Sequence, residues 1–208
     1  NSISSKLLEH FSFTERLIPN VLPSFSIHGF LLKSVALELG LKSGIPVSYK
    51  AGDQPNNALS LGVLEAGEVA ATAGTSGVIY AVTDEPTYDA SGAINSFAHV
   101  NYTQAHPNVG MLLCLNGCGI ANKWVKNLAK VSNYTTVNAL AATSNPGSNG
   151  VLFLPFGNGA ERMLHHRHVN AVLEGLNFNQ NTDADICRAV QEGVVFAMQY
   201  GVKSMQQM

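Results

Sequence analysis

The chain has 208 residues, of which 46% are apolar and 12% are charged. Because globular proteins carry roughly 25% charged residues, this chain can bury a sizeable core beneath a surface poor in charge, which excludes a disordered protein. Lys and Arg number 12 against 14 Asp and Glu, for a net charge of -2; this balance leaves no basic surface for a phosphate backbone and excludes nucleic acid as an expected partner.

The length allows one large domain or one domain and a fraction, since domains centre on roughly 100 to 150 residues. The first residue is Asn1 rather than Met, and we expect a piece of a longer protein. No apolar run reaches the roughly 18 residues of a membrane span, so a membrane is not an expected partner. Cys114, Cys118 and Cys187 show no paired metal spacing. Such cysteines are typical of a reducing compartment, and the cytoplasm is the expected location.

Helical periodicity predicts a first helix over residues 30–41. Residues 45–49 are rich in branched and aromatic side chains and predict a strand that ends at Asp53. A second helix is expected to start at Pro55 and to end near Leu64. A carboxylate between a strand end and a helix start is where open α/β sheets place catalytic groups. The sequence thus makes Asp53 a candidate catalytic residue, with an ordinary Gly-Asp turn as the alternative.

Two strand-like runs, residues 69–73 and 78–82, flank the turn Gly74-Thr75-Ser76-Gly77 and predict a β-hairpin. The glycines would let backbone N–H groups approach a ligand, and the two hydroxyls can donate to phosphate oxygens. One interpretation is therefore a phosphate-binding turn. The other is a tight hairpin whose glycines supply positive φ, since the turn has neither a Lys nor Walker spacing.

The polar stretch 84–107 has weak periodicity, and no element is predicted there. A strand over 109–115 and a helix over 116–130 follow, with Ile120, Trp124 and Leu128 on one helix face. Further strands are predicted over 151–156 and 171–178, before and after a polar loop.

The last predicted element is a long amphipathic helix. Thr182 and Asp185 have the spacing of a capping box at its start. An apolar stripe then continues along the helix through Ile186, Val190, Val194, Ala197 and Gly201.

Imidazoles at short spacing can bind zinc. One interpretation of His165, His166 and His168, together with Glu161, is therefore a metal site. Adjacent residues point apart, however, so a solvated loop is the preferred interpretation and no metal ligand is assigned. The chain has no Gly-x-Ser-x-Gly elbow and hence no support for acyl transfer by that route.

Several short motifs occur in one order along the chain. They are Ala-Gly-Asp-Gln at 51–54, Thr-Ala-Gly-Thr-Ser-Gly at 72–77, Gly119 five residues before Trp124, Leu-Pro-Phe-Gly at 154–157, Glu161-Arg162, and Arg-Ala-Val-Gln-Glu-Gly at 188–193. This combination resembles the FGGY carbohydrate kinases over nearly the whole chain, and residues 51–80 are most similar to the xylulokinases of that family. The resemblance implies an α/β fold of the ribonuclease H-like, actin-like ATPase class.

The family has two domains, with sugar and nucleotide meeting between them. The resemblance implies that residues 1–64 end the N-terminal, sugar-binding domain and that residues 65–208 form a large part of the C-terminal, nucleotide-binding domain. It implies ATP and Mg²⁺ as cofactors and a small sugar and ATP as partners, with a homodimer left open. The family's N-terminal phosphate and magnesium segment has no counterpart in these residues, so the chain alone is expected to be inactive.

Residue by residue, the resemblance makes Asp53 the general base and Gly74 and Thr75 a phosphate-contacting hairpin. It places Gly119 and Lys123 where the second domain approaches the nucleotide. Beside the base, on the sugar side, stands Gln54, where xylulokinases often carry Asn and glycerol kinases carry Gln.

The implied function is ATP-dependent phosphorylation of a ketose, D-xylulose to D-xylulose 5-phosphate. The alternatives are a kinase for another polyol or sugar acid, of the glycerol, gluconate or rhamnulose type, and a non-catalytic sugar-sensing relative.

Overall fold

The centre of the computed structural model, which describes residues 3–165 and 167–208, is a four-stranded antiparallel sheet of order β3-β4-β6-β5. The strands are β3 (Val69–Ala73), β4 (Gly77–Thr83), β5 (Asn95–Ala98) and β6 (Val109–Leu115). The two central strands pair along their full length, from Gly77 opposite Leu115 to Thr83 opposite Val109. The structure confirms the predicted hairpin and the 109–115 strand, and it adds β5, which the sequence did not predict.

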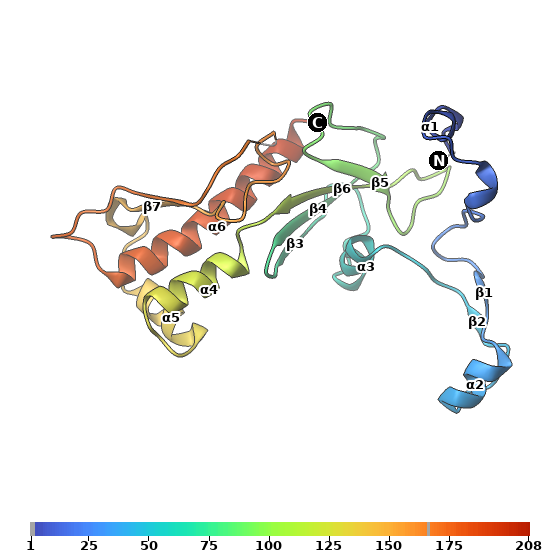
Figure 1. The fold of residues 1–208 in the computed structure, drawn as a ribbon, viewed down its shortest axis with the longest axis horizontal. Coiled ribbons are helices and arrows are strands. Elements are labelled where there is room, and N and C mark those ends of the chain that lie inside the picture. The colour runs from blue at the N-terminus through green and yellow to red at the C-terminus, as the bar shows by residue number, and fades with distance from the viewer. Residues whose placement is uncertain (1–2, 166) are drawn as a thin grey trace.

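One helix covers each face of this sheet (Figure 1). Side chains of β4 and β6 alternate between the faces, as the period of a strand requires. On one face Ile79 and Leu113 pack against α6 (Asp183–Gln206). On the other face Tyr80 and Leu112 pack against α3 (Asp53–Ser60), whose Ala58 is fully buried.

A second core lies beyond the end of the sheet. It is built from α4 (Gly119–Leu128), α5 (Tyr134–Ala142), η2 (Ser148–Gly150) and the pair β7 (Leu152–Leu154) and β8 (Val172–Glu174). The first half of α6 completes this core, and Val194 packs against both cores. The long helix therefore joins the sheet to the α4–α5 layer.

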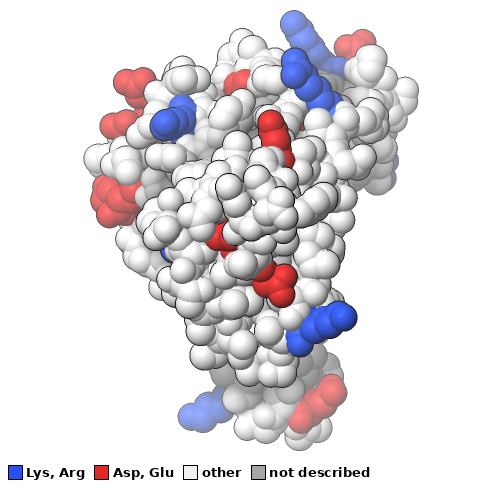
Figure 2. Space-filling model, turned by 90° about the vertical axis from the view of Figure 1, so that its left-hand side faces the viewer, with Lys and Arg blue, Asp and Glu red and all other residues white. Residues whose placement is uncertain are grey.

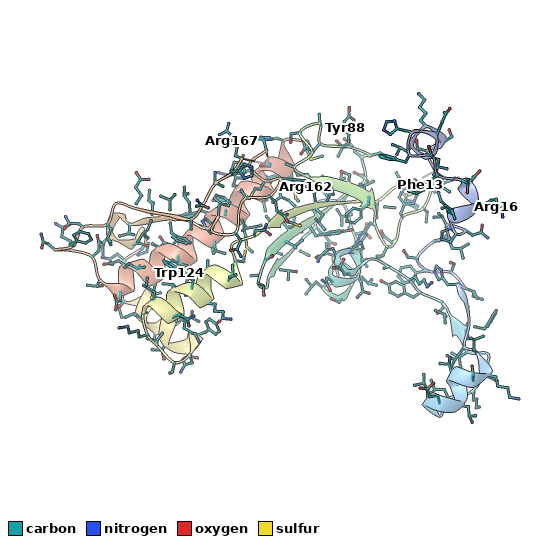
Figure 3. The ribbon with its side chains drawn as sticks, in the orientation of Figure 1. Phe13, Arg16, Tyr88, Trp124, Arg162 and Arg167 are labelled. Carbon is teal, nitrogen blue, oxygen red and sulfur yellow. The ribbon has the colours of Figure 1, made fainter. Side chains whose placement is uncertain are left out.

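The buried face of α4 differs from the predicted one. Ala121 and Val125 are buried, whereas Trp124 and Leu128 are 46% and 51% exposed. Trp124, labelled in Figure 3, stacks on Phe153, with ring centroids 5.8 Å apart. Ala121 and Val125 instead share the second core with Cys187 and Val190 of α6.

The predicted capping box at the start of α6 is confirmed. The backbone N–H of Thr182 donates a 2.8 Å hydrogen bond to Oδ2 of Asp185. The other oxygen of Asp185 accepts from the Ser144 hydroxyl at 2.6 Å and from Nδ2 of Asn149 at 2.8 Å. These donors hold the pKa of the buried Asp185 carboxyl below its usual value, with the Ser144 bond as the largest cause.

Glu192, two turns further along α6, binds the same loop. Its carboxylate accepts from the N–H of Gly147 at 3.1 Å and from the hydroxyl of Ser148 at 3.1 Å. Arg188 forms an ion pair with it at 2.7 Å. Two carboxylates of one helix thus fix loop 144–150, which leads into β7.

The N-terminal segment, residues 3–52, extends away from the sheet (Figure 1). It contains α1 (Ser5–His10), η1 (Glu15–Leu17), β1 (Gly29–Phe30), α2 (Lys33–Leu39) and β2 (Pro46–Val47). The predicted helix over 30–41 is shorter than expected, and the predicted strand over 45–49 has only two residues, paired with β1. Of residues 3–52, all of which the structure describes, Ala36 alone is buried. Both elements are short because no core supports them.

Charged side chains are sparse on the surface. The face shown in Figure 2 carries a few Lys, Arg, Asp and Glu residues separated by wide uncharged areas. Within residues 3–165 and 167–208, no helix combines the length and the apolar composition that a membrane crossing needs.

Candidate active site

Asp53 is the first residue of α3, and the predicted position at a strand end is wrong because β2 already ends at Val47. Gly52, with extended backbone, precedes the helix, and Pro55 lies in the first turn, where a helix needs no N–H donor. The Asp53 carboxylate is exposed. It accepts hydrogen bonds from the backbone N–H of Gln54 at 2.9 Å and from its Nε2 at 3.3 Å.

The turn between β3 and β4 is exposed at Gly74, Thr75 and Ser76. The N–H groups of Thr75 and Ser76 donate no backbone hydrogen bond within the described residues. Neither Gly74 nor Gly77 has a positive φ, so the interpretation of a turn that needs glycine for positive φ is wrong. Gly77 is required for packing instead, because a Cβ there would collide with Sγ of Cys118.

The start of α4 is bound directly to this turn. The N–H of Gly119 donates to the carbonyl of Gly74 at 2.7 Å, and the N–H of Ile120 donates to the carbonyl of Thr75 at 3.3 Å. A Cβ on Gly119 would lie 2.5 Å from the Gly74 oxygen, so only glycine permits this approach. Lys123 lies one turn further along α4 and is exposed.

Asp53 and the turn lie at the same end of the sheet. Cys114, the penultimate residue of β6, pairs with Val78, which follows the turn in β4. Burial raises the pKa of the Cys114 thiol, and the negative charges of Glu161 and Asp53 raise it further. Because Cys114 and Val78 also pack against the cluster that contains Ala58 of α3, the Asp53 carboxylate lies near the end of β6, on the face of the sheet that α3 covers.

Glu161 and Arg162 lie close to the same thiol, since the charge of Arg162 lowers the pKa of Cys114. Arg162 is fixed by a 2.6 Å hydrogen bond from its Nη1 to Oδ1 of Asn95, at the start of β5 (Figure 3). From the sequence, Glu161 was considered only as a possible metal ligand, and Arg162 had no site role. Their position in the Glu-Arg motif was the one signal that pointed to them, because the contact with β5 involves an unpredicted strand.

An apolar hollow of about 410 Å³ lies beside the first turns of α4. Its larger lining side chains are those of Ile120, Trp124, Phe153 and Pro155. Its size is in the range of small-molecule sites, and its lining residues Ile120 and Trp124 belong to the same helix as Lys123.

Of the residues considered for a metal site, those that the structure describes show no ligand geometry. His165 and His168 are exposed, and His166 lies outside the described residues. Across the part of the chain that the structure describes, no three His, Cys, Asp or Glu side chains gather in a position to hold a metal ion. This part offers no complete ligand set for Mg²⁺, and no residue is assigned to it.

Comparison with known proteins shows the family of the chain. The sequence model for the FGGY family of carbohydrate kinases, C-terminal domain, matches residues 69–208. The chain belongs to the FGGY family of carbohydrate kinases.

The xylulose kinase of Haemophilus influenzae is 28% identical over 193 residues, which cover 93% of this FGGY chain and 38% of the relative. The gluconokinase of Bacillus subtilis is 27% identical over 190 residues, which cover 86% of this chain and 36% of the relative. The structure of a xylulose kinase from Rhodospirillum rubrum superposes with a TM-score of 0.86 at 22% identity, over 99% of this chain and 41% of that one. The chain spans about two fifths of the length of these relatives.

The FGGY fold, of the ribonuclease H-like, actin-like ATPase class, is thereby confirmed. Backbone hydrogen bonds join Gly119 to Gly74 and Ile120 to Thr75, and Asp53 and Gln54 lie at the same end of the sheet. The roles expected for these residues and for Lys123 stay predictions.

Proposed function

We propose that this chain carries the general base and a phosphate-binding turn of an ATP-dependent sugar kinase that converts D-xylulose to D-xylulose 5-phosphate. One observation carries the proposal. An exposed carboxylate, that of Asp53, lies at the same end of the sheet as an exposed turn with free N–H groups at Thr75 and Ser76. A base and an anion site at one end of a sheet are what phosphoryl transfer to a hydroxyl requires.

Asp53 takes the proton of the attacking sugar hydroxyl. A base placed for this step contributes typically about 10² to 10⁴ in rate. Because the transferred phosphoryl group passes through a loose transition state, most of the remaining acceleration comes from alignment and charge stabilisation. The exposed position of Asp53 at the start of α3 leaves its outer oxygen lone pairs free to receive the hydroxyl.

The turn at residues 74–77 binds phosphate oxygens through the N–H groups of Thr75 and Ser76 and through their hydroxyls. Gly119 holds α4 against the turn, since its own N–H is used by the Gly74 carbonyl. Lys123 adds a positive charge one helical turn away. The apolar hollow beside Ile120 has the size and lining for a flat heterocyclic base, which supports ATP as the donor.

Mg²⁺ bound together with ATP would neutralise charge on the phosphates. The steps assigned to this chain do not pass through the metal. They are proton acceptance at Asp53, phosphate binding at the turn, and orientation of Asp53 by the amide of Gln54.

D-xylulose is the proposed acceptor because two of the similar proteins above are xylulose kinases. The gluconokinase similarity supports a sugar acid as the second candidate. Gln54 contacts the Asp53 carboxylate through its side-chain amide, so this amide is suited to bind an acceptor hydroxyl beside the base. This amide also keeps glycerol among the candidates. A non-catalytic relative is disfavoured because the exposed carboxylate of Asp53 is kept.

The experiment is a coupled ADP-release assay on the complete protein with ATP and Mg²⁺. D-xylulose, D-gluconate, glycerol and L-rhamnulose are compared as acceptors, and D-xylulose is expected to give the highest kcat/KM. A higher kcat/KM with gluconate or glycerol would change the proposed substrate, but the proposed reaction, phosphorylation of a hydroxyl group by ATP, would stand. No acceptor-dependent ADP release with any of them would overturn the proposed function.

A further inference from the structure

Two buried side chains connect the centre of the sheet to the end of α3. The Tyr80 hydroxyl lies 2.7 Å from Nδ1 of His99, and Nε2 of His99 lies 3.1 Å from the carbonyl oxygen of Val63. Tyr80 and His99 are each 2% exposed. A carbonyl only accepts, so Nε2 carries the proton and Nδ1 accepts from the Tyr80 hydroxyl. Burial lowers the pKa of His99, which keeps the imidazole neutral in this arrangement.

The sheet is built to admit this contact. Gly110, in β6, lies diagonally across from Tyr80, and a Cβ on Gly110 would collide with the Tyr80 hydroxyl. A glycine in the middle of a strand weakens the strand and is expected where another group approaches closely. The Tyr80 side chain therefore reaches His99 through a space that β6 leaves open.

The next peptide carbonyl is held from the same side. The oxygen of Leu64 accepts from Nδ2 of Asn101 at 2.9 Å and from Nδ2 of Asn108 at 3.1 Å. Asn108 also donates to Oδ1 of Asn101 at 3.2 Å. His99, Asn101 and Asn108 all belong to the connection between β5 and β6. This connection thus binds two successive carbonyls of the segment that leaves α3.

That segment transmits the contact to the base. The N–H of Val63 bonds to the carbonyl of Ala58 at 2.9 Å, and Ala58 is fully buried against the sheet. Asp53 is the first residue of this same short helix. Fixing one end of a rigid helix about 12 Å long fixes the position of the other end. Residues 3–52, by contrast, share no core cluster with the sheet among the described residues.

We propose that His99 is a positioning residue for the base: its hydrogen bond to the Val63 carbonyl ties the end of α3 to the β5–β6 connection, so that Asp53 keeps its place relative to the Thr75 turn when the residues before Gly52 move. The kinetic part of this inference rests on the proposed function. The boundary between the segment that moves and the part that stays fixed to the sheet then lies at Gly52 and not at Leu64. Asp53 therefore keeps a constant position relative to the phosphate-binding turn.

The test uses three variants of the complete protein. His99→Asn places an amide near the position of Nδ1 and keeps the Tyr80 contact, but it does not reach Val63. His99→Gln reaches the position of Nε2 and keeps the Val63 bond. Tyr80→Phe also perturbs the buried pair and leaves the imidazole–Val63 bond in place, so it is the matched control for loss of packing.

The first readout is amide hydrogen exchange, which does not depend on activity. His99→Asn is expected to raise exchange in residues 56–63 about tenfold, as loss of one buried hydrogen bond does, while β4 and β6 change little. His99→Gln is expected to stay within about threefold of the parent protein. The second readout is kinetic: His99→Asn lowers kcat about tenfold or more and leaves KM for ATP within about threefold, whereas His99→Gln restores kcat.

Unchanged exchange in α3, or an equal loss of kcat in His99→Asn and Tyr80→Phe, would overturn the inference and leave His99 as a packing residue. If the parent protein phosphorylates no acceptor, the proposed function fails. The hydrogen-exchange result still shows whether the contacts from the β5–β6 connection hold the end of α3. If His99→Asn does not fold, Asn101→Ala removes a Leu64 contact from a half-buried position. It is expected to raise amide exchange around Leu64 about threefold. No increase there would contradict the inference that the β5–β6 connection holds the segment that leaves α3.

Discussion

The N–H of Gly119 donates a 2.7 Å hydrogen bond to the carbonyl of Gly74, and this bond joins the first residue of α4 to the tip of the β3–β4 turn. Because no side chain fits between the two backbones, the helix and the turn are fixed relative to each other. The exposed N–H groups of Thr75 and Ser76 are therefore presented by a rigid support. Rigid placement of donors is what makes them effective toward a developing negative charge.

Gly119→Ala is predicted to weaken ATP use by displacing the turn. Its Cβ would lie 2.5 Å from the Gly74 oxygen, a backbone atom that cannot rotate away. We expect kcat/KM for ATP to fall about tenfold or more, with KM for the sugar changed less than about threefold. Steady-state kinetics with either substrate varied measures this. Gly29→Ala is the control, since a Cβ there meets nothing within 4 Å; an equal loss in both variants would contradict the role of the Gly119 contact.

Asp53→Asn is predicted to lower kcat by about 100-fold or more, because the amide cannot accept the proton of the sugar hydroxyl. The KM for the sugar should stay within a few-fold, since the side chain keeps its shape. Glu161→Gln is the comparison, because Glu161 is the other carboxylate that acts on Cys114. A larger loss in Glu161→Gln than in Asp53→Asn would transfer the base to Glu161.

Gly193→Ala is predicted to destabilise the fold more than Gly201→Ala. A Cβ on Gly193 would collide with the backbone oxygen of Phe153, which is fixed in β7. A Cβ on Gly201 would lie 2.6 Å from Cδ1 of Ile79, the end of a side chain that can rotate. Overpacking costs typically about 1–3 kcal/mol, and we expect Gly193→Ala at the upper end. Urea unfolding of both variants tests the order, which the reverse ranking would refute.

Asp185 predicts a specific loss of stability in acid. Its folded pKa lies below the ordinary value of 3.8, so its hydrogen bonds stabilise the fold fully above that pH and are lost as the pH falls through the folded pKa. The free energy of unfolding should therefore decline as the pH drops below about 4 to 5. Asp185→Asn should cost about 1–3 kcal/mol at pH 7 and flatten this decline.

The control for this prediction is Asp183→Asn, which removes an exposed carboxylate from the same helical turn. We expect its free energy of unfolding to decline with falling pH as steeply as that of the parent protein. Unfolding free energies at several pH values, from denaturant curves, provide the measurement. A slope unaffected by Asp185→Asn would show that other carboxyl groups govern acid stability.

The sequence predicted those elements whose pattern is local. The hairpin, β6 and α6 each have an uninterrupted apolar period and clear boundary residues, and the structure contains all three. It did not predict β5 or α5. β5 is four half-buried residues within a polar stretch, and it exists because β6 offers an edge for pairing. The strand expected over 45–49 fails for the opposite reason, since it has no core to cover.

The candidate site shows the same limit. The motifs identified Asp53, Thr75 and Gly119, but they did not show that Gly119 serves the turn through its missing side chain. They gave no reason to single out His99, because its contact with Val63 spans 36 positions along the chain. Contacts of that range depend on how α3 lies on the sheet, which no periodicity within either segment encodes.

The shared use of α6 by both cores has a consequence for how the protein unfolds. Val194 packs against the sheet core and against the α4–α5 core, so neither can melt without exposing apolar side chains of the other. Residues 53–208 should behave as one cooperative unit, with a single thermal transition reported alike by every probe placed within it. Residues 3–52 take no part in those cores and should exchange and be cleaved well below that transition.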